Sequence, residues 1–494
     1  MNLKTIAKIA VTCFVVMQAM HGRMAAQSVE EGHQRFRLVE LGTLGGPNSY
    51  FTFITGRSLN KQGMAIGSAD NPMAVEPPFC LIDCYLSHAF QWNEGVLTDL
   101  GGLLGVTVSG SAPNDINARG VVAGLAFNGG IDNVFGLPFF DGVIWKDGHI
   151  VDLGTFGGPL SYAAEINNRD QVVGFALNAT PDSFDLGDFC QNFPMPTQMR
   201  AFIWRDGVKK DLGTLGGTDS CALFVNEHGL TVGTSFTNST VNFTTGLPTI
   251  HPFLWTGEKM VDLQSLGGTI ATANGINDRG QVAGESTLAG DQIVHAFLWN
   301  KGKLTDLGNL GGNSLEVIGF SSTGAIVGKA DLPGSQTHGA FLAQDGIMMD
   351  LGTQDGDPCS VAIGVNSRGQ VVGGSTDCSN FLHAFLWENG RMIDLNSFVP
   401  TGSSLTLTQA DFISETGEIT AEAVLPNGDQ RAVLLIPCEE NQSDDDDCVD
   451  ASAQSVVSHQ TPVFRSLRGA PEPSSPLLRL DPNQHVKLSN RATN

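Results

Sequence analysis

The sequence has few basic side chains for its length. It holds 27 Lys and Arg against 51 Asp and Glu, a formal net charge of −24 over 494 residues. Nucleic acids and anionic lipid surfaces repel such a chain, so neither is an expected partner. The chain also has only three tyrosines. Few spare aromatic platforms are therefore left for stacking sugars, which counts against a lectin.

The signatures of several enzyme classes are also missing. The sequence contains neither Gly-x-Ser-x-Gly nor His-Glu-x-x-His, the motifs of α/β-hydrolases and of zinc metalloproteases. Its Gly-Gly pairs are followed by no helical pattern and no Gly-Lys-Ser/Thr, which argues against nucleotide binding. We therefore expect no cofactor.

Long apolar runs are limited to the N-terminus. Lys4 and Lys8 precede an apolar stretch at 9–20, and Met24-Ala25-Ala26 follows it. This pattern predicts a secretory signal peptide over residues 1–26, and the run is too short to span a bilayer comfortably. The alternative is an uncleaved anchor. We expect a secreted, extracellular monomer with no membrane span after cleavage; the periplasm and the cell surface are the other options.

Eight cysteines remain after the predicted signal, and an even number in an exported chain favours disulfides over zinc. No two Cys-x-x-Cys pairs face each other, as a zinc site would need. The pairs that are local in sequence are Cys80–Cys84, Cys190–Cys221, Cys359–Cys378 and Cys438–Cys448. The spacing alone leaves the connectivity open.

One unit is repeated along most of the chain. Its start is marked by an acidic residue, and the last three spacings are all 44 residues. These acidic residues are Glu40, Asp99, Asp152, Asp211, Asp262, Asp306, Asp350 and Asp394. Each unit predicts four short strands, with an Asn-x-x-Gly turn after the first and a tight hairpin between the third and fourth. A fixed period of this size indicates a supersecondary unit that is stacked repeatedly.

We therefore predict an all-β fold: an eight-bladed β-propeller of four-stranded antiparallel blades over residues 27–438. Residues 36–41 form a lone fourth strand before the first unit, and the last unit has only three strands. The N-terminal strand is expected to join the last blade and close the ring, which removes exposed sheet edges. Residues 439–494 contain the acidic run 444–447 and a Pro-Ser segment, and are expected to be mostly disordered.

The repeated phrases resemble those of the extracellular HAF-repeat proteins of bacteria. The phrases are 295–299 (His-Ala-Phe-Leu-Trp), 211–217 (Asp-Leu-Gly-Thr-Leu-Gly-Gly) and 276–282 (Ile-Asn-Asp-Arg-Gly-Gln-Val). The resemblance covers roughly residues 36–436 and implies export and a repeat-built fold. It implies no activity, ligand or catalytic residues. Some copies depart from the pattern: strand three of the second unit begins with Asp141, and Ala343 replaces tryptophan in the sixth.

The repeated polar and aromatic residues are predicted to be structural. Histidines at equivalent places on different blades are spread around a ring, so they cannot share one metal ion; they are His88, His251, His295, His338 and His383. We predict hydrogen bonding for these histidines, turn capping for the repeated aspartates and packing between blades for the tryptophans. The tryptophans are Trp92, Trp145, Trp204, Trp255, Trp299 and Trp387. No metal site and no catalytic residue is predicted.

Function on a repeat scaffold is expected where the units differ. The connections between strands two and three are long in units one to four, at 70–86, 127–139, 178–199 and 238–250. We predict that they form a rim that binds an extracellular protein or polysaccharide. The candidate ligand-binding residues are Phe135, Phe139, Asp182, Asp185, Asp188 and Phe189. The alternative is that the loops only pack on each other.

Two functions remain open. A non-catalytic binding scaffold is favoured over a carbohydrate-active hydrolase that uses paired carboxylates above the channel. Asp185 and Asp188 are the first pair to test for the hydrolase.

Overall fold

The computed structural model describes residues 35–450 except 52–55, 77–83, 106–108, 132–135, 185, 191–194, 335, 355 and 439–447. The predicted signal peptide and residues 451–494 lie outside the described residues. The regular structure of the described chain is β-strand except for one short α-helix, α2 (Gly187–Cys190), and one 3-10 turn, η1 (Leu395–Phe398). None of its helices is long and apolar enough to cross a membrane.

The strands follow the repeat units. Unit 1 comprises β2 (Ser49–Tyr50), β3 (Ala65–Ala74), β4 (Tyr85–Asn93) and β5 (Val96–Asp99). Unit 2 comprises β6 (Ser111–Ile116), β7 (Val122–Ile131), β8 (Pro138–Lys146) and β9 (His149–Asp152). Unit 3 comprises β10 (Gly157–Ile166), β11 (Val172–Pro181), β12 (Thr197–Arg205) and β13 (Val208–Asp211). Unit 4 comprises β14 (Ser220–Val225), β15 (Thr231–Phe236), β16 (Ile250–Trp255) and β17 (Met260–Asp262).

The second half of the chain continues the same order. Unit 5 comprises β18 (Gly267–Ile276), β19 (Val282–Leu288), β20 (Val294–Asn300) and β21 (Lys303–Gly308). Unit 6 comprises β22 (Leu315–Phe320), β23 (Ile326–Asp331), β24 (His338–Gln344) and β25 (Ile347–Asp350). Unit 7 comprises β26 (Cys359–Val365), β27 (Val371–Thr376), β28 (Phe381–Glu388) and β29 (Arg391–Asp394). Unit 8 comprises β30 (Thr406–Ile413), β31 (Ile419–Val424) and β32 (Gln430–Pro437), joined by β1 (Arg35–Glu40) and β33 (Val449–Asp450).

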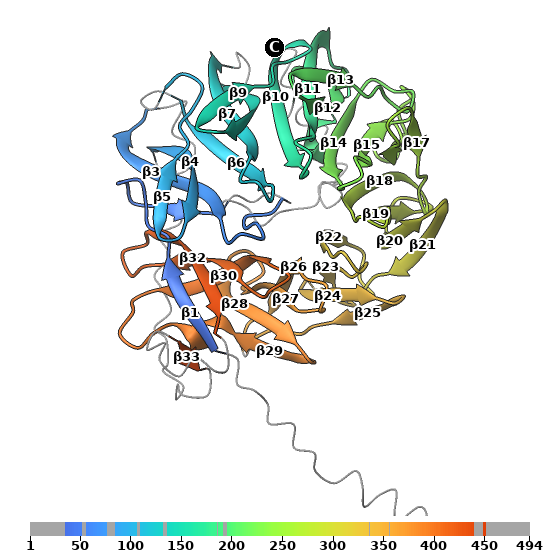
Figure 1. The fold of residues 1–494 in the computed structure, drawn as a ribbon. Coiled ribbons are helices and arrows are strands. Elements are labelled where there is room, and N and C mark those ends of the chain that lie inside the picture. Colours follow the sequence, from blue (N-terminus) through green and yellow to red (C-terminus); the bar gives the residue numbers. More distant parts are fainter. Residues whose placement is uncertain are drawn as a thin grey trace, which may run out of the picture.

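The units lie around a common centre, with their first strands innermost (Figure 1). Five of the seven sheets are four-stranded and antiparallel, as the repeat predicts. The predicted count of eight separate sheets is wrong. Units 4 and 5 form one continuous sheet, because β16 and β18 make a parallel bridge between Ile250 and Ile270. The arrangement is therefore β-propeller-like with seven sheets.

The N-terminal strand joins the last unit. β1 pairs antiparallel with β32, with Phe36 opposite Pro437 and Glu40 opposite Val433. On its other edge β1 pairs with β33, where Phe36 lies opposite Val449. This extra strand belongs to a segment predicted to be mostly disordered. The disulfide Cys438–Cys448 connects the start of β33 to the end of β32, with β1 between the two strands.

The N-terminal strand joins the last unit as predicted, but the ring is not closed as stated. In the described residues the sheets of units 8 and 1 share no strand pair. They meet through hydrogen bonds to side chains: the Ala432 amide donates to Ser49 Oγ at 3.1 Å and the Gln430 amide to Asn48 Oδ1 at 2.9 Å. Side-chain packing, which includes buried Leu434, completes the contact.

Glycine in strand two makes room for the phenylalanine of strand three. In unit 5, Gly284 of β19 lies opposite Phe297 of β20. A Cβ on Gly284 would lie 2.1 Å from the Thr272 carbonyl oxygen and 2.6 Å from the Phe297 ring. Phe297 is fully buried in the space that the glycine leaves. The repeated Gly and Phe are therefore packing partners inside each sheet, which is buried on both faces.

The Asn-x-x-Gly turns also connect successive units. Within the turn of unit 5, Asn277 Oδ1 accepts the amides of Arg279 and Gln281, both at 3.1 Å. The side-chain nitrogen, Nδ2, of the asparagine that opens each of these turns donates to a backbone oxygen in the turn of the next unit. These bonds run from Asn60 to Asn117 (3.0 Å), Asn117 to Asn167 (3.2 Å), Asn167 to Asn226 (3.0 Å) and Asn226 to Asn277 (3.0 Å). We call this series the asparagine ladder.

The asparagine ladder has two interruptions. Asn277 still reaches Ser322 of unit 6 at 3.5 Å, and Asn366 reaches Ser414 of unit 8 at 3.1 Å. Units 6 and 8 carry Ser321 and Ser414 in the asparagine position. A hydroxyl is too short to span two units, and in the described structure neither serine donates to the following turn. The junctions between units 6 and 7 and between units 8 and 1 therefore lack this bond.

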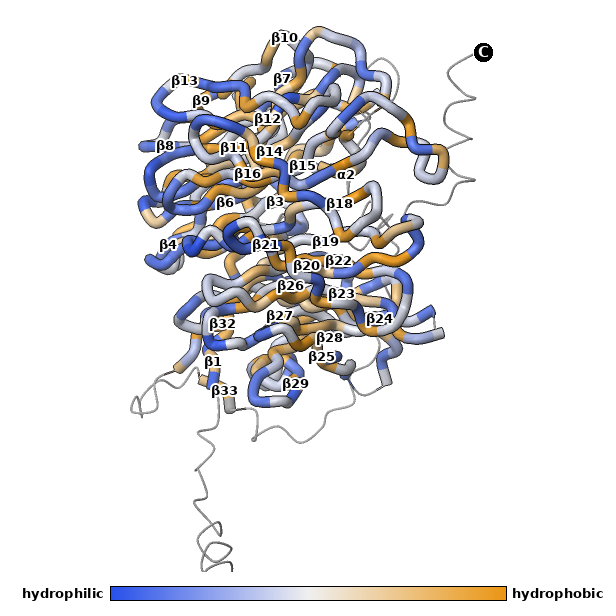
Figure 2. The backbone as a smooth tube through the Cα atoms, turned by 90° about the vertical axis from the view of Figure 1, so that its right-hand side faces the viewer, coloured by the Kyte–Doolittle hydropathy of each residue, from blue (hydrophilic) through white to orange (hydrophobic). Residues whose placement is uncertain are grey.

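The molecule has two different faces. The connections between strands two and three lie on the same side as the connections that lead to the next unit. In unit 4, for example, Gly217 of the connection before β14 donates its amide to the oxygen of Phe236, where β15 ends and the connection to strand three begins (3.0 Å). We call this side the loop face; α2 lies on it (Figure 2). The Asn-x-x-Gly turns and the hairpins between strands three and four lie on the opposite side, the turn face.

Candidate functional site

The repeated histidines are hydrogen-bonded, as predicted, and their partners are the repeated aspartates, a pairing that was not predicted. His88 Nδ1 lies 2.9 Å from Asp99, and the same pair recurs as His251–Asp262 (3.0 Å) and His295–Asp306 (2.8 Å). The aspartate also caps its own turn, since Asp99 Oδ1 accepts the Gly101 amide at 2.7 Å. Partial burial would raise the pKa of Asp99, but these hydrogen bonds outweigh it and lower the pKa.

The other repeated side chains fill similar structural roles. His383 departs from the pattern and lies 2.7 Å from Asp357. Four of the tryptophans are buried, with exposed fractions of 4–8%: Trp92, Trp145, Trp204 and Trp255. Trp299 and Trp387 pack against the buried clusters between units. The described residues contain no group of three or more His, Cys, Asp and Glu side chains placed to hold a metal ion.

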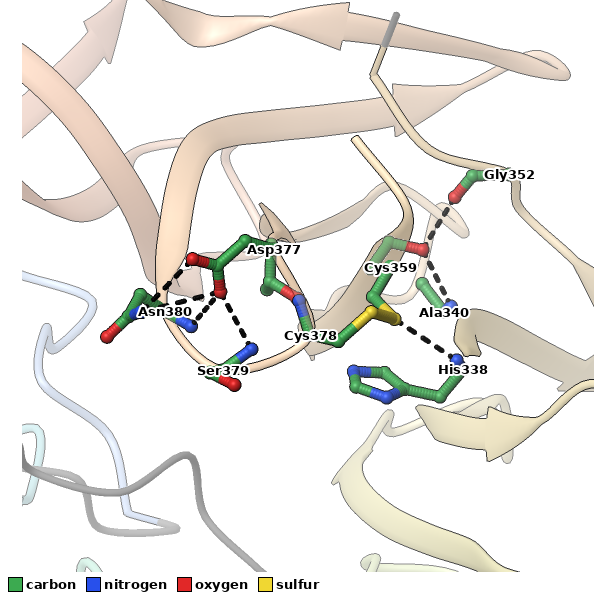
Figure 3. The surroundings of a disulfide bond; sticks show 10 residues. His338, Ala340, Gly352, Cys359, Asp377, Cys378, Ser379 and Asn380 are labelled. Carbon is green, nitrogen blue, oxygen red and sulfur yellow. Dashed lines mark hydrogen bonds between the residues drawn. A yellow bond between two sulfur atoms is a disulfide. The ribbon is translucent and has the colours of Figure 1, made fainter. Parts of the chain in front are cut away.

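Three disulfides join the pairs that are local in sequence: Cys190–Cys221, Cys359–Cys378 and Cys438–Cys448. Cys84 is disulfide-bonded as well, whereas Cys80 lies outside the described residues. The first two bonds attach connections of the loop face to inner strands. Around Cys359–Cys378, the His338 amide donates to Cys359 Sγ at 3.3 Å, and Asp377 accepts the Ser379 amide at 2.9 Å (Figure 3). These connections are thus fixed in place.

The structure separates the residues predicted to bind a ligand at the rim. Phe189 is 8% exposed and Phe139 packs on the same buried cluster, so neither projects as an open contact. Asp182 is half-buried and is hydrogen-bonded to Asp219. Burial, followed by the charge of Asp182, raises the pKa of Asp219 to about 6. Phe135 and Asp185 lie outside the described residues, as does the side chain of Asp188.

Other apolar side chains on the loop face are exposed. They are Tyr85, Leu104, Ile131, Val241, Phe243 and Ile293. Phe243, in the connection of unit 4, is fully exposed at 104%. The sequence analysis named the connection of unit 4 but none of these side chains. A signal was available, since Phe243 lies directly between the polar residues Asn242 and Thr244.

The connection that carries Phe243 is held by Asn242. Its Nδ2 donates to Thr269 Oγ1 at 2.9 Å and to Asp291 Oδ2 at 3.3 Å, which joins the connections of units 4 and 5. Its Oδ1 accepts the Thr244 amide at 2.8 Å. We call the exposed Val241, Phe243 and Ile293 of these joined connections the apolar patch. It is presented on an ordered base, so binding would order little additional backbone.

A charged cluster that breaks the repeat joins units 1 to 3: Arg57 lies between β2 and β3, and Asp115 lies on β6. Arg57 donates to both carboxylate oxygens of Asp115, at 2.9 and 2.8 Å, and to the Ile166 oxygen at 2.6 Å. Asp115 is fully buried and also accepts the Ile166 amide at 2.9 Å. These bonds tie three successive units together. The sequence analysis did not single out either residue.

Glu165 belongs to the same region. It accepts the Val225 amide of unit 4 at 2.5 Å. Burial, with the charge of Asp115 adding to it, raises the pKa of Glu165 to about 8 despite the nearby Arg57. Glu165 therefore holds a proton at neutral pH. In units 5 and 7 the equivalent residue is glycine, Gly275 or Gly364, so comparison of the copies would have identified it.

A second pair of carboxyl groups lies on the inner strands of unit 8. Burial raises the pKa of Asp411 to about 7, although Gln409 donates a hydrogen bond to it. Burial and the charge of Asp411 together raise the pKa of Glu422 well above its usual range. Asp411 Oδ2 and Glu422 Oε1 have no hydrogen-bond partner among the described residues. This pair, like Glu165, is chemically suited to holding protons.

A third departure from the repeat joins units 2 and 3. Asp141 replaces histidine opposite Asp152, and burial, followed by the charge of Asp152, raises its pKa to about 6. Lys209 occupies a strand-four position that is apolar in other units; its Nζ lies 4.6 Å from the Phe156 ring centre and donates to the Thr155 oxygen at 2.9 Å. Burial lowers the pKa of Lys209 to about 8, although the charges of Asp152 and Asp141 act to raise it. The lysine compensates the extra carboxylate.

Substitution of Glu165 is expected to change how stability depends on pH. With a pKa of about 8 when folded, against its ordinary 4.5, the group is protonated in the folded chain and ionised in the unfolded chain across this window. The folded state binds more protons, so its stability falls as pH rises towards 8. Relative to Glu165→Gln, the natural protein should lose about 1 kcal/mol or more between pH 5.5 and 8 in denaturant titrations.

Glu94→Gln, at an exposed hairpin position, is the matched control and should leave the natural profile unchanged. Parallel profiles for the natural protein and Glu165→Gln would show that Glu165 is ionised in the folded state.

The sequence matches no protein-family model, and no curated protein is similar to it. Among solved structures, the acylaminoacyl peptidase of Pyrococcus horikoshii is 12% identical with a TM-score of 0.38, over 74% of this chain and 56% of its own. The β-propeller domain of the Trilobed protease from Pyrococcus furiosus is 8% identical with a TM-score of 0.37, over 72% and 98%. Dipeptidyl peptidase 4 of Porphyromonas gingivalis is 10% identical with a TM-score of 0.39, over 73% and 56%.

This chain thus spans just over half the length of the two peptidases that it resembles. Similarity at these values says nothing about activity.

Proposed function

We propose that the protein is an exported, non-catalytic scaffold of the HAF-repeat type that binds an extracellular protein or polysaccharide through its loop face. The observation that carries the proposal is the apolar patch, with fully exposed Phe243 at its centre. Large apolar side chains that water surrounds gain free energy when a partner covers them. The disulfides are compatible with export.

The position of the site differs from the rim predicted in the sequence. The connections of units 2 and 3 supply packed phenylalanines, which support the loop face from within. The connections of units 4 and 5 supply the exposed apolar side chains of the apolar patch. We therefore centre the binding surface on Val241, Phe243 and Ile293 rather than on Phe139 and Phe189.

Loss of the apolar patch is expected to abolish binding. The full chain is screened against an array of glycans and a panel of purified extracellular proteins, and the triple variant V241S/F243S/I293S is compared with it. Because each buried apolar side chain contributes about 1.5–3 kcal/mol, the variant should bind at least about tenfold more weakly.

The matched control is V96S/V208S/I347S, which removes exposed apolar side chains of similar size from the outer strands. This control should bind normally. Equal affinity of the two variants, or no binding by the natural protein to any probe, would overturn the proposal.

A carbohydrate-active hydrolase is the second candidate, favoured by the raised pKa values of Glu165 and Asp411, since a glycosidase needs a protonated carboxyl group as its acid. Assay of the same glycan array for released reducing ends tests it. Hydrolysis that is lost in Glu165→Gln or Asp411→Asn would establish the enzyme.

A further inference from the structure

Basic residues are missing from every connection of the loop face. None of these segments contains Lys or Arg: 41–48, 75–84, 100–110, 132–137, 153–156, 182–196, 212–219, 237–249, 263–266, 289–293, 309–314, 332–337, 351–358, 377–380, 395–405 and 425–429. The turn face has them in most units. Its turns carry Lys61, Arg119, Arg169, Arg279 and Arg368. The two faces therefore differ in charge as well as in shape.

Exposed carboxylates are distributed over the loop face. The fourth strand of nearly every unit ends in an acidic residue at this side, and Glu40, Asp306 and Asp350 among them are exposed. Glu76 and Asp377 of the connections are exposed as well. Glu40 is paired with Arg431 and Asp211 with Arg200, but the connections themselves hold no basic residue. A face with apolar side chains and carboxylates suits a polypeptide segment that is both basic and apolar.

The chain itself has such a segment. Residues 451–494 carry five basic side chains against Glu472 and Asp481, a net charge of +3 in a chain whose total is −24. The basic residues are Arg465, Arg468, Arg479, Lys487 and Arg491. Phe464, Leu467 and Leu478 lie among them. This segment is opposite in charge to the repeats that precede it.

The length of the segment allows it to reach the loop face. It leaves the sheet at Asp450, which lies opposite Arg35 at the turn-face end of β1. Any unfolded chain of 44 residues has a root-mean-square span of about 35–40 Å and a full extension of about 150 Å. Tethering gives the segment an effective concentration on the order of millimolar at its own surface, so weak contacts suffice.

We propose that residues 451–494 dock on the loop face of their own chain, with their arginines against its carboxylates and Phe464 and the leucines against the apolar patch. The docked segment covers the surface that the proposed function assigns to an external partner. Partner and segment then compete, and release of the segment exposes the binding surface. The inference requires no external partner to exist.

Hydrogen exchange of the full chain tests the docking. The natural protein is compared with R465E/R468E/R479E, whose folded part is untouched. Docking predicts that the amides of 237–249 and 289–293 exchange several-fold faster in the variant and, for the natural protein, in high salt, because the contacts are largely ionic. The control R205E/K301E, on hairpins of the turn face, should leave these amides unchanged, and all three proteins should share one unfolding temperature.

Identical exchange in the natural protein and the tail variant would overturn the proposal. Protection that disappears on dilution would also overturn it, since the occupant would then be a second copy of the chain. These outcomes are independent of the binding array, where the triple patch variant is read against external probes. Failure of docking and failure of the proposed function are therefore distinguishable.

Discussion

Deletion of residues 35–40 is expected to abolish the cooperative unfolding of the protein. The deletion removes β1, which pairs on one edge with β32 and on the other with β33. It also removes Phe36, which is 2% exposed and whose ring centre lies 4.9 Å from that of Phe398. The edge of the last sheet would then be open and its apolar cluster exposed to water. Calorimetry measures the loss as a broad, low-enthalpy transition.

Deletion of 451–494 is the control and should leave a sharp transition. A milder test is Phe36→Ala, which should cost about 3–5 kcal/mol, whereas Arg37→Ala should stay within about 0.5 kcal/mol. A protein that lacks residues 35–40 but unfolds like the natural one would show that unit 8 needs no fourth strand.

Asp115→Ala is expected to destabilise the protein by about 3 kcal/mol. The substitution leaves the Arg57 guanidinium, which is one-third exposed, without its two carboxylate bonds. It also leaves the Ile166 amide without its acceptor. Loss of one partner of a buried pair costs more than the pair contributes, because the remaining charge stays desolvated. Urea titration measures the change as a lower midpoint with an unchanged slope.

The double variant R57M/D115L removes both charges together and should recover most of the loss, since no unpaired ion remains. Asp377→Ala, at an exposed loop position, should change stability by less than about 1 kcal/mol. A double variant as unstable as Asp115→Ala would show that the pair acts through its shape rather than its charge.

The strands could be predicted because each unit repeats the same local physics. Asn and Gly set the turn, Gly in strand two accommodates the phenylalanine ring, and the His–Asp pair holds the end of strand four. Every copy adds the same information, so even units with a departure, such as Asp141 or Ala343, fold alike. The roles of the histidines, aspartates and tryptophans followed from their regular spacing.

The sheet count and the strand β33 could not be predicted. One bridge, Ile250 to Ile270, merges two units into one sheet, and no pattern in the sequence marks a single pair of backbone bonds. β33 has two residues and follows an acidic run, so neither periodicity nor composition indicates a strand. Its position depends on the Cys438–Cys448 bond and on the free edge of β1, which are tertiary features.

The candidate site was predicted at the level of segments but not of side chains. Loop length identified the connections, because residues inserted into a repeat unit form loops on the surface. Phenylalanines in those loops were interpreted as exposed, yet Phe189 packs beneath the loop, where burial stabilises it. Phe243 stays in water because Asn242 fixes the backbone on either side of it. Which of two loop phenylalanines is buried depends on neighbours that the linear sequence does not show.

The Arg57–Asp115 pair also bears on how similar units find their correct places. A chain of near-copies risks assembling in the wrong order, since the asparagine ladder fits any neighbour that carries the same turn. Arg57 finds its carboxylate only when unit 1 stands beside unit 2, and β1 completes only the unit that lacks a fourth strand. Such contacts can form only in the correct order of units. They therefore disfavour swapped or out-of-register assemblies that the repeated contacts would tolerate.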